Sequence, residues 1–166
     1  MAKSSVYLET SIPSYLKARP SRDLVIAARQ QITNDWWELR RADFALHISQ
    51  LVLDEAGQGD RQAAAERLAA LRGIPILDIT EPAVSLAETL LQGGVLPERA
   101  ARDALYVAVA CVHGIDFFLT WNCAHLANAE TMGTLADAIL SDGYEPPVIC
   151  TPDELMGDYA WPEIPL

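Results

Sequence analysis

Short apolar runs alternate along this chain with segments of helical periodicity, and this alternation limits the possible folds more than any other feature. The runs are rich in β-branched and aromatic residues and predict strands at residues 6–8, 44–49, 74–79, 115–120 and 148–150. Strands that alternate with helices favour a parallel sheet covered on both faces. In such a sheet, ligands bind beyond the carboxyl ends of the strands, so these ends are where catalytic residues are expected.

The segments between the strands carry helix signals. Helices are predicted over residues 23–41, 60–72, 82–92, 100–113 and 134–140. Pro82 suits the first turn of its helix, and glycines follow three of these segments, at Gly73, Gly93 and Gly114. No repeat or linker is visible, so we predict a single α/β domain over residues 1–158 and a C-terminal tail over residues 159–166.

The length and the net charge exclude several classes of protein. The 166 residues are enough for one domain with a full core, and no apolar run approaches the roughly 20 residues that span a bilayer. The apolar stretch near the N-terminus is too short for a signal peptide, so a cytoplasmic location is expected. The formal charge of −11 argues against nonspecific nucleic-acid binding through a broad basic face, although it does not exclude a nuclease.

The cysteines and histidines do not form a recognisable metal motif. Three cysteines are scattered along the chain, which fits neither a disulfide framework nor a paired zinc motif. Cys123 and His125 lie close together, but two ligands do not complete a zinc site, and a structural use is favoured.

Acidic side chains follow the predicted strands. Glu9 comes directly after the first strand, and Glu55, with Asp54 beside it, follows the second strand and an apolar run. Adjacent residues on a helix point about 100° apart, so at most one of Asp54 and Glu55 faces a site squarely. Each acid also has a simpler interpretation, as a loop or solvent-facing side chain.

Two further side chains complete the candidate set. Asp103 lies in the first turn of a largely apolar helix, where it could serve the helix dipole, yet a partly buried acid favours a nearby cation. Asn122 follows the fourth strand and could be either a turn residue or a neutral oxygen ligand. Clustered carboxylates repel one another, and Mg²⁺ or Mn²⁺ is the natural cation for oxygen ligands. Together these residues suggest metal-assisted phosphodiester hydrolysis, and no dinucleotide, P-loop or serine-hydrolase motif competes.

The four positions resemble the motifs of PIN domains. Residues 6–12 (VYLETSI) look like the opening strand and acid, and residues 49–55 (SQLVLDE) resemble the second motif, with its acid at Glu55. Residues 102–108 (RDALYVA) look like the third motif, with its acid at Asp103, and residues 119–122 (LTWN) are similar to the fourth. The resemblance extends from about residue 6 to about residue 155.

This resemblance implies a PIN-like three-layer α/β/α sandwich whose central parallel sheet has the order 3-2-1-4-5. It also implies that Glu9, Glu55, Asp103 and Asn122 bind one or two Mg²⁺ or Mn²⁺ ions and cleave RNA. Many bacterial members of this size are VapC-type toxins of toxin–antitoxin pairs, often homodimers neutralised by a small antitoxin protein. Glu9 and Asn122 stand where the family more commonly has Asp, which makes a second metal ion less certain.

Two alternatives remain open at this stage. A PIN fold that has lost most catalysis and persists through partner contacts is slightly favoured by Asn122 and by the acidic charge, whereas the retention of three acids disfavours it. Trp121 is a candidate for stacking against an RNA base, although a packed tryptophan is an equally good interpretation. Trp36 and Trp37 are predicted to be core and dimer residues of the long helix.

Overall fold

The computed structural model describes residues 1–159 of the chain and contains one five-stranded parallel sheet. The strand order is β3-β2-β1-β4-β5, as the PIN resemblance implied. The strands are β1 (Ser5–Leu8), β2 (Ala45–Ser49), β3 (Ile76–Leu77), β4 (Phe117–Leu119) and β5 (Val148–Cys150).

The central strand is β1, which fixes the register on both sides. Tyr7 pairs with His47 of β2 and with Phe118 of β4. Val6, Tyr7 and Leu8 are all fully buried, as expected for a strand of a parallel sheet that is covered on both faces. Because every pairing is parallel, the carboxyl ends of the strands lie at one edge of the sheet.

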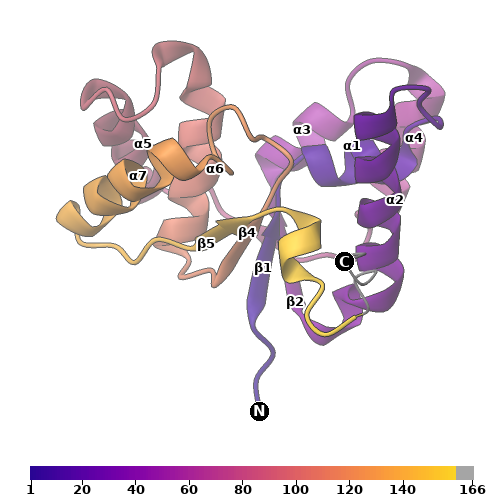
Figure 1. Ribbon diagram of the computed structural model, residues 1–166. Helices are drawn as coiled ribbons and strands as arrows, with labels where there is room; N and C mark the ends of the chain where they lie inside the picture. The colour runs from indigo at the N-terminus through magenta and orange to yellow at the C-terminus, as the bar shows by residue number, and fades with distance from the viewer. Residues whose placement is uncertain (160–166) are drawn as a thin grey trace.

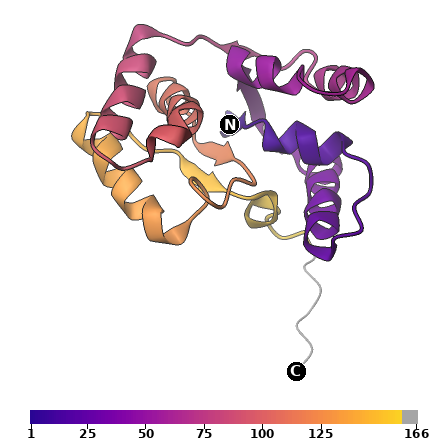
Figure 2. The ribbon, with the colours of Figure 1, turned by 90° about the horizontal axis from the view of Figure 1, so that it is seen from above.

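Helices cover both faces of the sheet (Figures 1 and 2). They are α1 (Ser11–Lys17), α2 (Leu24–Leu39), α3 (Gln50–Ala56), α4 (Arg61–Ala70), α5 (Glu81–Gln92), α6 (Ala101–Val112) and α7 (Ala129–Ser141). Single 3₁₀ turns occur at η1 (Arg41–Asp43), η2 (Glu98–Ala100) and η3 (Pro152–Leu155). Helices α5, α6 and α7 lie on one side of the sheet and α1 to α4 on the other, which confirms the predicted three-layer sandwich.

The elements differ from the sequence predictions mainly at their ends. Helix α1 was not predicted; Pro13 is the third residue of this helix, where a missing N–H costs no intrahelical hydrogen bond. Helix α7 begins five residues earlier than predicted, and the side chain of Asn128 caps it by accepting a hydrogen bond from the backbone N–H of Glu130. The predicted tail, apart from Tyr159, lies outside the described residues.

No helix in the described part of the chain is long and apolar enough to cross a membrane.

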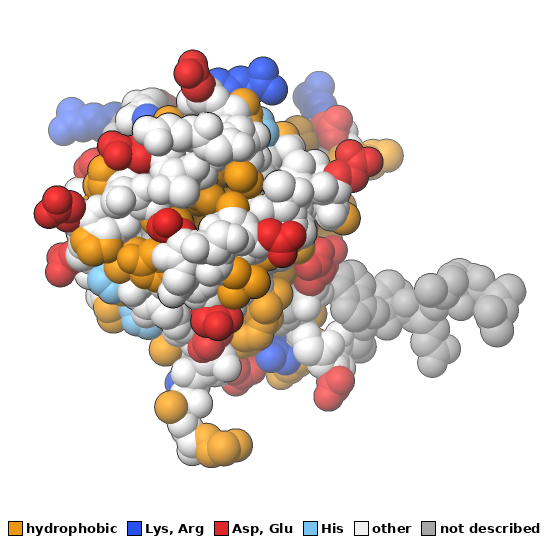
Figure 3. All heavy atoms as spheres, turned by 90° about the vertical axis from the view of Figure 1, so that its left-hand side faces the viewer, with side chains coloured by type: hydrophobic (Ala, Val, Ile, Leu, Met, Phe, Trp, Pro, Cys, Tyr) orange, Lys and Arg blue, Asp and Glu red, His pale blue; other side chains and the backbone are white. Residues whose placement is uncertain are grey.

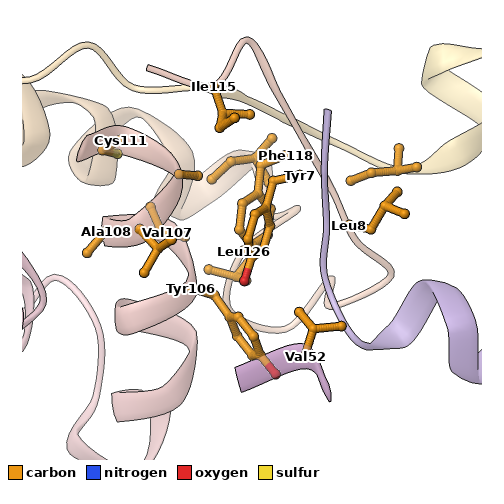
Figure 4. Packing of buried hydrophobic residues seen from close by; sticks show 14 of the residues in the cluster. Tyr7, Leu8, Val52, Tyr106, Val107, Ala108, Cys111, Ile115, Phe118 and Leu126 are labelled. Carbon is orange, nitrogen blue, oxygen red and sulfur yellow. The ribbon is translucent and has the colours of Figure 1, made fainter. Parts of the chain in front are cut away.

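Aromatic side chains join the sheet to α6. The rings of Tyr7 and Phe118 stack with their centroids 5.2 Å apart, and both side chains are fully buried. In Figure 4 these two rings lie beside β1 on the side of α6 from which Tyr106 extends. Trp36 of α2 is also fully buried, which confirms its predicted place in the core, whereas Trp37 is only partly buried beneath the guanidinium of Arg41.

Truncating the central ring of this core should destabilise the protein strongly. The substitution Phe118→Ala removes a fully buried ring and its stacking partner for Tyr7, so we expect the free energy of unfolding to fall by about 3–5 kcal/mol. Urea denaturation measures this loss. The matched control is Val148→Ala on the edge strand β5, where the side chain is 58% exposed and the loss should be below about 1 kcal/mol. Similar losses in the two variants would contradict the proposed core.

Candidate functional site

The four predicted site residues all follow strands of the sheet or begin a helix beside them. Glu9 comes directly after β1, and Glu55 lies in α3, which begins immediately after β2. Asp103 is in the first turn of α6, and Asn122 lies in the loop after β4. The sheet therefore brings the four segments to the edge where its strands end.

Glu9 is a buried carboxylate, with only 6% of its surface exposed. Its Oε2 accepts hydrogen bonds from the backbone N–H of Ser11 at 3.1 Å, from the hydroxyl of Ser11, and from Oγ1 of Thr120 at 2.8 Å. Burial raises the pKa of Glu9; these hydrogen bonds oppose the shift, and the charge of Glu55 adds to it. No basic side chain in the described part of the protein forms an ion pair with Glu9.

Glu55 faces α6, whereas its neighbour Asp54 faces solvent. The Oε2 of Glu55 accepts hydrogen bonds from Nη1 of Arg102 at 3.0 Å and from the hydroxyl of Tyr106 at 2.7 Å. Asp54 is exposed and accepts a hydrogen bond from Gln50 within its own helix. Of the two adjacent acids, Glu55 is therefore the one that faces the site, as the motif resemblance implied.

Asp103 and Asn122 are linked through His125. The Nδ1 atom of His125 donates to Oδ2 of Asp103 at 2.9 Å, and both side chains are largely buried. The side-chain oxygen of Asn122 accepts a hydrogen bond from the backbone N–H of His125 at 3.1 Å. Asn122 therefore stabilises the turn that places His125 beside Asp103, and its oxygen is engaged there rather than with the acids.

Tyr106 joins three elements of the site, and the sequence analysis did not identify it. Its hydroxyl lies 2.6 Å from Oγ1 of Thr10 and donates to Glu55, so Thr10 donates to Tyr106. Burial raises the pKa of Tyr106, which keeps the phenol protonated and able to donate. Tyr106 lies three residues after Asp103 and four after Arg102 on α6, and this helical spacing was the available signal. Figure 4 shows its ring extending from α6 toward Val52 of α3.

Trp121 is packed inside the protein and is not available to stack on a base. It is 7% exposed, and its Nε1 donates to Oγ1 of Thr33 at 2.8 Å. The ring of Tyr15 packs against it, and the guanidinium of Arg29 lies 5.2 Å from its ring centre. The candidate role in RNA stacking is therefore replaced by the structural alternative.

The donor chemistry of the site fits a hard divalent cation, but its side chains are not yet arranged around one point. Glu9, Glu55 and Asp103 offer carboxylate oxygens, the ligands that Mg²⁺ and Mn²⁺ prefer, and buried Glu9 lacks a cationic partner in the described structure. However, residues 1–159 contain no group of three acidic, histidine or cysteine side chains already placed to hold an ion. The contacts of Glu55 and Asp103 each use one carboxylate oxygen, Oε2 of Glu55 with Arg102 and Tyr106, and Oδ2 of Asp103 with His125.

The strand order and the flanking helices define a PIN-like α/β/α fold. The comparison with solved structures finds a chain from the crystal structure of VapBC2 of Rickettsia felis bound to a DNA fragment from its promoter. The similarity has a TM-score of 0.56 at 15% identity and covers 89% of this chain and 98% of that one. No protein-family model and no curated protein sequence matches the chain. The structural likeness therefore supports the fold.

The buried carboxylate of Glu9 should make stability depend on pH in the absence of metal. Because its pKa is raised in the folded protein, the folded state binds the proton more tightly than the unfolded state. The stability contributed by the proton is complete below the ordinary pKa of about 4.5 and is lost as the pH rises through the raised pKa. The variant Glu9→Gln has no carboxylate to ionise, so its stability relative to wild type should increase over the same pH interval.

Urea denaturation in the presence of a chelator, repeated across this interval, measures the difference. The control Glu88→Gln changes an exposed acid of α5 and should follow wild type at every pH. If the difference in free energy of unfolding between Glu9→Gln and wild type is the same at every pH, burial does not shift the titration of Glu9.

Proposed function

We propose that this chain is a divalent-metal-dependent endoribonuclease. The observation that carries the proposal is the buried carboxylate of Glu9, which lacks a cationic partner in the described structure and lies at the sheet edge where Glu55 and Asp103 also occur. Unpaired buried carboxylates are costly, and a bound cation offsets that cost. The order of these acids along the chain also matches the PIN resemblance.

In this proposal, Glu9, Glu55 and Asp103 would hold Mg²⁺ or Mn²⁺, which would lower the pKa of bound water and neutralise charge on the phosphodiester. Ser11 and Thr120 fix Glu9 by hydrogen bonds to one of its oxygens. Tyr106 similarly holds one oxygen of Glu55. Asn122 contributes by holding the His125 turn, and its oxygen would reach an ion only after releasing that backbone N–H.

The charge distribution favours RNA access at the site edge over the outer helical face. Figure 3 shows acidic side chains spread across the face that α5 and α7 form, with basic side chains mostly along its upper margin. Such a face repels a phosphate backbone. A locally bound cation would supply the positive charge that the rest of the surface does not.

We further propose that the chain acts as the toxin of a type II toxin–antitoxin pair. The support is the structural likeness to a chain of the VapBC2 complex, together with the net charge of −11, which suits a basic antitoxin. A cognate antitoxin should suppress RNA cleavage at a molar ratio near one.

We also propose a homodimer, because the apolar side chains of Leu24, Val25 and Ile26 are exposed at the start of α2. Sedimentation velocity tests the oligomeric state.

A second candidate is a partner-binding PIN-like module with little catalysis. It is favoured by the contacts that Arg102, Tyr106 and His125 already make with the acids, which leave no preformed three-residue metal group in residues 1–159. Metal binding and RNA cleavage by wild type and Asp103→Asn separate the two functions.

Replacing Asp103 by Asn should abolish both metal binding and cleavage. Asn can still accept the hydrogen bond from His125, so the fold should be retained while the charge is lost. With Mg²⁺ or Mn²⁺, wild type should melt at a higher temperature and cleave labelled RNA, and the variant should lose at least about 100-fold in cleavage rate.

The control is Asp137→Asn, which removes the same charge from an exposed position on α7 and should behave as wild type. A folded wild type that neither responds to metal nor cleaves RNA would reject the nuclease and favour the partner-binding module. Equal cleavage by wild type and Asp103→Asn would contradict the proposed role of Asp103 in binding the metal.

A further inference from the structure

Arg102 is a basic side chain that contacts Glu55, one of the acids of the site. Its Nη1 lies 3.0 Å from Oε2 of Glu55, and the two side chains are 57% and 30% exposed. The pair is therefore at the rim of the site and not in the core. Since Arg remains charged at any ordinary pH, the contact is a permanent ion pair in the absence of metal.

The contact neutralises the same carboxylate that the proposed function assigns to a divalent cation. Tyr106 donates to the same oxygen of Glu55, at 2.7 Å, and Tyr106 is in turn held by Thr10. Glu55 is therefore kept in place by a neutral donor, and Arg102 is not needed to orient it. Arg102 adds a positive charge, and this charge competes with the divalent cation for the carboxylate of Glu55.

The competition should be easily reversed. An ion pair with exposed partners contributes only about 0–1 kcal/mol, because water screens it and the long side chain loses freedom. A divalent cation bound to Glu55, with Glu9 and Asp103 as further ligands, can displace the guanidinium. The exposed side chain of Arg102 then remains at the rim of the site with all its N–H donors available.

We propose that Arg102 is an exchangeable counter-ion: it neutralises Glu55 until a divalent cation binds, and it then binds the phosphate backbone of the RNA. This inference rests on the proposed nuclease function and adds a substrate-binding role for Arg102. Guanidinium groups bind phosphate oxygens in two-point geometry, and such contacts position a nucleic acid without reading its sequence.

The variant Arg102→Gln should change metal binding and RNA binding in opposite directions. Without the competing charge, the Mn²⁺ concentration at half-maximal thermal stabilisation should fall by about twofold to fivefold, which corresponds to the strength of an exposed ion pair. Without the phosphate contact, the KM for labelled RNA at saturating Mn²⁺ should rise by about threefold or more. A general loss of structure would weaken both instead.

Two further variants serve as controls. Arg99→Gln removes the same charge from an exposed side chain at the 3₁₀ turn before α6, and it should leave both quantities near wild type. Arg102→Lys keeps the positive charge, so the Mn²⁺ midpoint should return most of the way to the wild-type value.

The outcomes separate this inference from the proposed function. If wild type binds Mn²⁺ and Arg102→Gln shifts the midpoint no more than Arg99→Gln, or raises it, the counter-ion role is overturned while the nuclease remains. An unchanged KM overturns the phosphate role. If neither wild type nor Arg102→Gln responds to Mn²⁺, the proposed function fails and this inference fails with it.

Discussion

The buried carboxylate of Glu9, at the end of the central strand, is the constraint around which the rest of the site is arranged. Strand β1 pairs on both sides, so the residue that follows it is surrounded by other elements and shielded from water. Hydrogen bonds from Ser11 and Thr120 offset part of the cost of burying its charge, but no ion pair in the described structure does. A site for a cation, or for a proton, follows from that imbalance.

The neighbouring acids, unlike Glu9, contact nitrogen-bearing side chains. Glu55 forms an ion pair with Arg102, and Asp103 accepts a hydrogen bond from His125, and both contacts join segments that are far apart in the sequence. A divalent cation at the proposed site would have to compete with these pairs for the two carboxylates. Its affinity would then depend on the partners of the acids as much as on the acids themselves.

Much of the fold could be predicted from local patterns. The apolar runs located all five strands, and the PIN resemblance gave their order. Helix α1 was missed; it has only seven residues, and it contains Pro13, which a helix tolerates in its first turn. The boundaries of α7 depended on the cap that Asn128 provides, which a periodicity of apolar residues does not reveal.

The candidate site was predictable in its positions and less so in its contacts. The sequence placed Glu9, Glu55 and Asp103 near one edge, because parallel strands end there, and the structure agrees with those positions. It did not reveal that Asn122 would accept a hydrogen bond from His125, or that Tyr106 would link Thr10 to Glu55. Such contacts join segments that are distant in the sequence, so they depend on the three-dimensional packing that no local pattern encodes.

The most direct test of the proposed metal site is anomalous diffraction from crystals of the protein soaked in Mn²⁺. The account predicts an anomalous peak about 2.2 Å from carboxylate oxygens of Glu9, Glu55 and Asp103, with the guanidinium of Arg102 displaced from Glu55. A fully soaked crystal without a peak at these acids, with Arg102 still paired to Glu55, would contradict it.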